Sequence, residues 1–291
     1  PTVCASDVLN VSYTGTANSG ANYTWDFNGG NILSGSGQGP YTVSWNTGGN
    51  YSVGLTVSEN GCNSLPVNMP VLVKSIPVVS ISPVPSLCIG QTNVVNFTGS
   101  AGAGSIYTWN FGNASVISGS GSGPYTLQWN NPGHDQVQLS VDDNGCVAQS
   151  NIDVTVNAIP TSDFIVNNAA CIGAPVSLNY IGTATPAANY NWTFNGGTVV
   201  SGSGVGPYTV IWNLQGNFQI SLIVDENGCV SAQTDLQATI NPLPVVFAGN
   251  AQLVCSGTPV PLGGPAVAGE IYLWTPSINL SDPAVSDPVS T

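Results

Sequence analysis

One stretch of the chain, which reads YTWDFNGGNILSGSGQGPYTVSWN in its first copy, occurs three times. The copies run from Tyr23 to Asn46, from Tyr107 to Asn130 and from Tyr190 to Asn213, and a shorter, altered copy begins at Tyr272. In each copy, aromatic residues alternate with polar ones on both sides of a glycine-rich segment. The alternation indicates two half-buried β-strands, and the glycines supply the positive φ angles of the crossing between them.

The three copies recur every 83 to 84 residues, and this period defines the domains. No window shows a sustained apolar period of 3.6 residues, and glycine and proline interrupt every candidate helix. The period and the density of turns therefore predict tandem all-β modules and not a helical solenoid. We predict repeat 1 at 1–75 without its first strand, repeat 2 at 76–158, repeat 3 at 159–242 and a partial repeat 4 of a divergent subtype at 243–291.

Each full repeat is expected to be a β-sandwich of about seven strands. In repeat 3, short alternating segments such as Tyr208–Trp212 and Phe218–Val224 are separated by turn signals, the strongest being Asn227-Gly228. Half-buried antiparallel strands of this length close most simply as two packed sheets of immunoglobulin-like type. Prolines two residues into each junction predict short, stiff joints, so we expect an elongated rod of sandwiches.

The repeated tryptophans are predicted to lie in the cores of the sandwiches. The first in each repeat alternates with tyrosine and phenylalanine on one face of its strand, as core residues do. The alternative use of such residues is stacking on carbohydrate. The predicted core aromatics are Trp25, Trp45, Trp109, Trp129, Trp192 and Trp212.

The cysteines also follow the repeat. Two in each of the first three repeats lie 58 residues apart, and the seventh, Cys255, lies in repeat 4. The constant spacing favours pairing within each repeat, with Cys255 unpaired: Cys4–Cys62, Cys88–Cys146 and Cys171–Cys229. The alternative pairs cysteines across the linkers: Cys62–Cys88, Cys146–Cys171 and Cys229–Cys255. No cysteine has zinc-ligand spacing, so structural disulfides in an oxidising compartment are expected. Each 58-residue loop would then stabilise its domain by about 4 kcal/mol.

The charge composition excludes several classes of partner. Only 5% of residues are charged, with a single lysine, no arginine and a net charge of −13. Binding to nucleic acid or to anionic lipid headgroups requires cationic side chains that this chain lacks. No apolar run approaches the length of a membrane-spanning helix, so no direct membrane insertion is expected. Together with the expected disulfides, this favours an exported, extracellular protein, and the family resemblance described below implies the cell surface.

No residues form a recognisable catalytic or cofactor-binding set. A strand follows each glycine-rich segment, whereas a phosphate-binding loop precedes a helix. His134 is the only histidine and has no nucleophile motif beside it, so an enzyme is not expected. Two acidic turns offer candidate calcium ligands, but they lack the frame and the downstream glutamate of a calcium loop. These candidates are Asp142, Asp143, Asp225 and Glu226. A plain hairpin is the simpler interpretation of both turns, so no cofactor is expected, with calcium as the alternative.

The strand Tyr23, Trp25, Asp26, Phe27 followed by Gly29 resembles the core motif of the PKD domain family. Repeats 2 and 3 depart from that motif, with Asn110 and Thr193 in place of the aspartate. The wider pattern of SGSGxGPYxVxW and NGC resembles PKD-like repeats of large, type IX-secreted surface proteins of Bacteroidota, including gliding-motility and attachment adhesins. The resemblance implies immunoglobulin-like sandwiches in an adhesin stalk or fibre, whose partners are neighbouring repeats, surface polysaccharide or other copies of itself. The alternatives are polysaccharide-binding or spacer modules of a secreted hydrolase, and a filament subunit that associates laterally.

Overall fold

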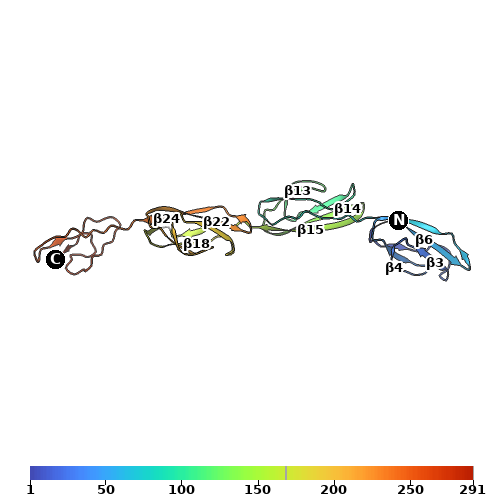
Figure 1. Cartoon of the computed structure of the whole chain (residues 1–291), viewed down its shortest axis with the longest axis horizontal. Coiled ribbons are helices and arrows are strands. Elements are labelled where there is room, and N and C mark those ends of the chain that lie inside the picture. Colours follow the sequence, from blue (N-terminus) through green and yellow to red (C-terminus); the bar gives the residue numbers. More distant parts are fainter. Residues whose placement is uncertain (168, 291) are drawn as a thin grey trace. The chain divides into compact units, whose positions relative to one another are not determined.

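The computed structural model describes residues 1–167 and 169–290, which contain strands and turns but no α-helix. The all-β prediction is therefore confirmed. The chain divides into two compact units. Figure 1 shows strands and connecting loops along the chain and no coiled ribbon. The first holds residues 1–159 and the turn 227–229, and the second holds the other described residues from Pro160 onward. Every hydrogen-bonded sheet draws its strands from a single predicted repeat. The boundaries themselves stay predictions.

Repeat 1 forms two sheets. Its strands are β1 (Thr2–Cys4), β2 (Leu9–Val11), β3 (Asn22–Asp26), β4 (Asn31–Ser34), β5 (Tyr41–Ser44), β6 (Gly49–Glu59), β7 (Cys62–Asn63) and β8 (Val67–Lys74). One sheet has the order β1-β8-β6-β3, with β7 paired to β6, and the other has the order β2-β5-β4. The pairings are antiparallel except that of β1 with β8, which is parallel.

Repeat 2 has the same plan. Its strands are β9 (Leu87–Cys88), β10 (Thr92–Val95), β11 (Ile106–Asn110), β12 (Ser115–Ser118), β13 (Tyr125–Gln128), β14 (Gly133–Asp143) and β15 (Cys146–Asn157). The sheets have the orders β11-β14-β15-β9 and β10-β13-β12. Here β9 is the parallel edge strand, paired with the end of β15.

Repeat 3 repeats this plan with an added edge strand. Its strands are β16 (Phe164–Val166), β17 (Ala169–Cys171), β18 (Val176–Tyr180), β19 (Asn189–Thr193), β20 (Thr198–Ser201), β21 (Tyr208–Ile211), β22 (Gly216–Glu226), β23 (Cys229–Val230) and β24 (Thr234–Asn241). The sheets have the orders β17-β24-β22-β19, with β23 paired to β22, and β16-β18-β21-β20. In the described part of repeat 4, β25 (Val260–Pro261) pairs with β26 (Val289–Ser290).

Each core lies between the two sheets of its repeat because alternate strand residues point inward. In repeat 3, Leu178 of β18 and Val210 of β21 contribute from one sheet, and Ile220 and Leu222 of β22 contribute from the other. All four side chains are fully buried. Repeats 1 and 2 have equivalent cores.

The six repeated tryptophans divide into two sets. Trp45, Trp129 and Trp212 are fully buried, with exposed fractions of 2%, 1% and 1%. Trp25, Trp109 and Trp192 are half-buried and pack against the edge of the core. Their indole N–H groups donate to carbonyls within the glycine-rich segment, those of Gly37, Gly121 and Gly204, at 3.0, 3.1 and 3.1 Å. The glycine-rich segment is therefore a hairpin loop between two paired strands of one sheet, such as β4 and β5, and the expected crossing between sheets is wrong there. The half-buried tryptophans fasten this loop to β3, β11 or β19 of the other sheet.

We expect the glycines of this hairpin loop to differ sharply in their tolerance of alanine. Gly119 has φ +123°, and a Cβ there would lie 2.5 Å from the Pro124 carbonyl oxygen and 2.7 Å from Tyr125 Cα. Gly121 has φ +58°, with nothing within 4 Å of its Cβ position. Gly121→Ala should cost about 1 kcal/mol for the left-handed backbone. Gly119→Ala should cost about 2 kcal/mol more because the backbone must also move. Calorimetry of both variants measures the difference, and equal costs would contradict this geometry of the loop.

Candidate functional site: the cross-repeat disulfides

Four of the seven cysteines form two disulfides, Cys4–Cys146 and Cys88–Cys229, each with a Cα–Cα distance of 5.7 Å. Each bond joins the first cysteine of one repeat to the second cysteine of the next. The predicted pairs Cys4–Cys62, Cys88–Cys146 and Cys171–Cys229 are therefore wrong, and so are the alternative pairs across the linkers. Cys62, Cys171 and Cys255 are unbonded and exposed.

The strand register explains why a bond within one repeat cannot form. In repeat 1, Cys4 lies opposite Lys74 at the end of β8. The preceding residue of β8, Val73, pairs with Gly49, so Cys4 lies at the end of the sheet where β6 begins. Cys62 pairs instead with Glu59, at the other end of β6. Ten residues of strand separate these ends, which is roughly 33 Å. A disulfide tolerates a Cα–Cα distance of at most about 7 Å, so the two cysteines of one sandwich can bond only outside it.

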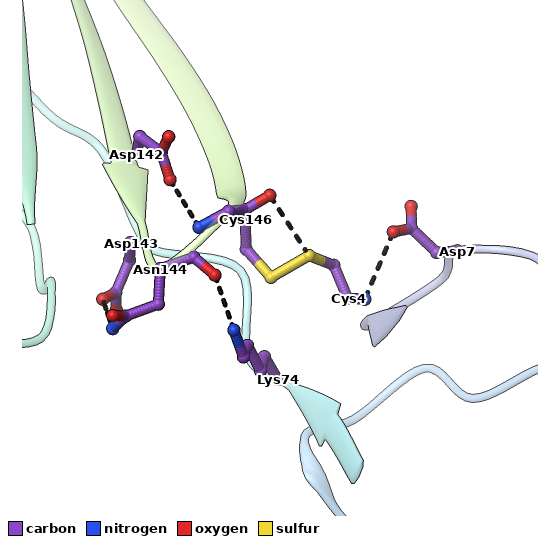
Figure 2. Close-up of a disulfide and its surroundings, with 8 residues drawn as sticks. Cys4, Asp7, Lys74, Asp142, Asp143, Asn144 and Cys146 are labelled. Atoms are coloured by element: carbon purple, nitrogen blue, oxygen red, sulfur yellow. Dashed lines mark hydrogen bonds between the residues drawn. A yellow bond between two sulfur atoms is a disulfide. The ribbon is translucent and has the colours of Figure 1, made fainter. Parts of the chain in front are cut away.

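A tight hairpin turn presents the second cysteine of each bond. Before Cys146, Asn144 and Gly145 have φ angles of 53° and 93°, as a two-residue hairpin turn of β14 into β15 requires. The Asp142 carboxylate accepts the Gly145 N–H at 2.6 Å (Figure 2). Cys146 is 1% exposed. The sequence Asp-Asp-Asn-Gly therefore shapes the turn that brings Cys146 to its partner.

The first cysteine is held by the end of its edge strand. The Cys4 N–H donates to the Asp7 carboxylate at 3.2 Å, and the Ala5 N–H donates to the Lys74 carbonyl at 2.8 Å. The Lys74 ammonium donates to the Asn144 carbonyl at 2.6 Å, so the chain's single lysine contacts the turn that carries Cys146 (Figure 2). The same turn lies against the sulfur itself, since Cys4 Sγ is 3.7 Å from the Gly145 carbonyl oxygen.

The second bond repeats this local geometry. Cys88 ends β9 opposite Asn157, and its N–H donates to Gln91 Oε1 at 2.9 Å. Its Sγ lies 3.7 Å from the carbonyl oxygen of Gly228, as Cys4 Sγ does from that of Gly145. Cys229 is 1% exposed. Both bonds thus join an edge-strand end to a hairpin turn.

Three of the four candidate calcium ligands, Asp142, Asp143 and Glu226, accept hydrogen bonds from other groups of the protein. Asp143 accepts the Gly102 N–H at 2.9 Å and the Asn144 amide at 2.9 Å. Glu226 accepts the hydroxyl and the N–H of Thr185, at 2.6 and 2.9 Å, and these bonds hold the pKa of the Glu226 carboxyl below its usual value. Asp225 lies in β22 opposite Asn189. Among the described residues, no group of three or more His, Cys, Asp and Glu side chains could hold a metal ion.

We expect calcium to leave the stability unchanged, because Asp142, Asp143 and Glu226 already accept hydrogen bonds from the protein. If one of these turns bound calcium, a calcium concentration ten times the Kd would raise the free energy of unfolding by about 1.4 kcal/mol. Thermal unfolding in calcium and in chelator measures this. A calcium-dependent rise in the midpoint that disappears in Asp142→Asn would establish a site at this turn.

The outer face of the larger sheet of repeat 2 carries a shallow groove of about 430 Å³. Uncharged polar side chains of β11, β14 and β15 line most of it. Among the described residues that line it, Trp109 is the one aromatic side chain, which is not the flat row of rings that carbohydrate stacking requires. His134 lies in β14 opposite Thr155, and its Nδ1 is 3.4 Å from the Thr155 hydroxyl on the neighbouring strand.

No protein-family model matches the chain, and no curated protein matches it in sequence. Among solved structures, the N-terminal eight immunoglobulin domains of Down Syndrome Cell Adhesion Molecule align with a TM-score of 0.52 at 11% identity, over 84% of this chain and 36% of that one. An I-band fragment of titin aligns with a TM-score of 0.43 at 12% identity, over 84% and 95%. The insect immune protein hemolin aligns with a TM-score of 0.34 at 12% identity, over 84% and 74%.

The first of these similarities confirms the predicted fold class. This chain consists of tandem immunoglobulin-like sandwiches. Such low identities concern the fold alone. In residues 1–167 and 169–290 there is also no helix that could span a membrane.

Proposed function

We propose that the chain is a structural repeat region of a large extracellular protein, the stalk or fibre shaft of a cell-surface adhesin. The observation that carries the proposal is the pairing of cysteines between consecutive repeats. A bond within a domain stabilises that domain alone. A bond to the next repeat adds a second covalent connection beside the backbone linker.

The two disulfide loops overlap, and this overlap suits a chain under tension. The loop closed by Cys4–Cys146 and the loop closed by Cys88–Cys229 share residues 88–146. If repeat 2 unfolded, the bonds would still limit how far its neighbours could separate. A shaft that holds a ligand-binding region away from a surface needs this resistance to extension.

The proposed location is the outside of the cell. Disulfides persist in oxidising compartments and are rare in the cytosol. The motifs shared with PKD-like repeats favour a Bacteroidota surface protein exported by the type IX route, in which gliding motility is one use of such a shaft. The role is mechanical and needs neither a catalytic residue nor a cofactor.

Small-angle scattering of the oxidised protein tests the proposed shaft. Each repeat should contribute roughly 30 to 40 Å to the longest dimension, so that the particle is a rod. A compact particle in which the repeats fold back on one another would contradict a role as a spacer.

A further inference from the structure

Cys62 and Cys171 are exposed and unbonded, yet each has the position of a cysteine that is bonded elsewhere in the chain. Cys62 is the hairpin-turn cysteine of repeat 1. It pairs in register with Glu59 as Cys146 does with Asp143. The turn before it, Asn60-Gly61, has φ angles of 49° and 80°, close to those before Cys146.

Cys171 is the edge-strand cysteine of repeat 3. It ends β17 opposite Asn241, as Cys88 ends β9 opposite Asn157. The two residues after it repeat the bonds made after Cys88. Ile172 N–H donates to the Asn241 carbonyl at 3.1 Å, and Gly173 N–H donates to the Trp212 carbonyl at 2.9 Å. The corresponding bonds in repeat 2 are Ile89 to Asn157 at 3.0 Å and Gly90 to Trp129 at 2.7 Å.

Cys62 therefore has the backbone geometry of the hairpin-turn half of such a disulfide, and Cys171 has that of the edge-strand half. Neither is bonded to another cysteine of this chain. The bonded hairpin-turn cysteines, Cys146 and Cys229, are 1% exposed, whereas Cys62 is open to solvent. Cys255 differs from both sites, because it lies outside the strands described in 243–290.

We propose that Cys62 and Cys171 are complementary covalent attachment sites. Cys62 takes the edge-strand cysteine of another repeat of this kind, and Cys171 takes a hairpin-turn cysteine. The proposed partner is a second copy of this chain, which carries the complementary half of each site, so copies join through Cys171 of one and Cys62 of the other. This joining does not require that the chain carry tension.

The bond forms by thiol–disulfide exchange with a small disulfide such as oxidised glutathione. The thiolate of one cysteine attacks the small disulfide and releases one thiol. The second cysteine then attacks the mixed disulfide and releases the other. Two protein thiols and one small disulfide thus become one protein disulfide and two small thiols.

A complementation experiment with the full chain tests the proposal. Cys62→Ser retains Cys171, and Cys171→Ser retains Cys62. In a glutathione redox buffer, the unsubstituted protein should form a ladder of covalent oligomers on a non-reducing gel. Each variant alone should lose the ladder and remain monomeric, and an equal mixture of the two should form a dimer and stop there. Peptide mapping of that dimer should recover Cys62 linked to Cys171.

Cys255→Ser is the matched control and should retain the full ladder. Both tested cysteines are exposed, so serine at either site should leave circular dichroism unchanged. Any of three results would overturn the proposal: a dimer of either variant alone, a disulfide through Cys255, or a mixture that stays monomeric.

Discussion

Reducing the two disulfides should lengthen the fully stretched segment from Cys4 to Cys229 nearly fourfold. With both bonds intact, the shortest covalent path runs from Cys4 to Cys146, back along about 58 residues to Cys88, and on to Cys229. At about 3.5 Å per residue, this path extends to roughly 200 Å. The reduced segment of about 225 residues extends to roughly 800 Å.

Single-molecule stretching between the chain ends, with and without reductant, measures this change. The double variant Cys4→Ser with Cys146→Ser adds a graded control. It keeps Cys88–Cys229, so the shortest path becomes the stretch of about 84 residues from Cys4 to Cys88, which is roughly 290 Å. If cysteines paired within repeats, the same variant would lose two bonds and its path would be about twice as long. That length would contradict the cross-repeat pairing.

Trp129→Ala should destabilise repeat 2 by about 3 to 5 kcal/mol, as other deletions of a buried large aromatic do. Trp129 is 1% exposed, and its indole N–H donates to Asp135 Oδ2 at 2.8 Å. The substitution removes both the apolar volume and this bond. Because single domains are typically stable by about 5 to 15 kcal/mol, the loss is a large share of the total. Hydrogen exchange of peptides from β13 to β15 measures it.

Trp109→Ala is the matched control within the same repeat. Its ring is half-buried, against Phe111 and Tyr125 at centroid distances of 5.5 Å. We expect a cost of roughly 1 to 2 kcal/mol, since less apolar surface returns to water. An equal or greater cost than that of Trp129→Ala would mean that the two tryptophans have been assigned the wrong roles.

The fold was largely predictable because strand alternation and turn chemistry are local. Tyr208 to Ile211 forms a strand, as its alternation predicts, and Asn227-Gly228 forms the hairpin turn. The repeats then supply three independent instances of the same pattern. Each sheet is therefore confined to one predicted repeat.

The cysteine pairing could not be predicted from spacing because a constant spacing fits more than one partner. Cys4 is 58 residues from Cys62, but the separations of the observed pairs, 142 and 141, are just as regular. The signal that distinguishes them is which end of the sheet each cysteine occupies. The Asn-Gly turn places Cys62 at one end, whereas Cys4 is placed at the other end by a parallel pairing with β8. Parallel pairing of distant segments has no local sequence signature.

The surroundings of the buried tryptophan differ between the repeats, and this difference could not be predicted from the sequence because it depends on long-range packing. Tyr51 and Phe218 pack against Trp45 and Trp212, at centroid distances of 5.6 and 5.7 Å. At the same register position of repeat 2, Asp135 accepts the indole N–H instead. An aspartate beside a core tryptophan looks like a solvent-facing residue in the sequence, and only the fold shows that its carboxylate reaches the ring.

Peptide mapping of the unreduced, thiol-blocked protein tests the cross-repeat pairing most directly. Trypsin has a single lysine to cut, so chymotrypsin or pepsin should be used. We predict a peptide containing Cys4 linked to one containing Cys146, and Cys88 linked to Cys229. Recovery of Cys4 linked to Cys62, or of Cys88 linked to Cys146, would contradict the cross-repeat pairing.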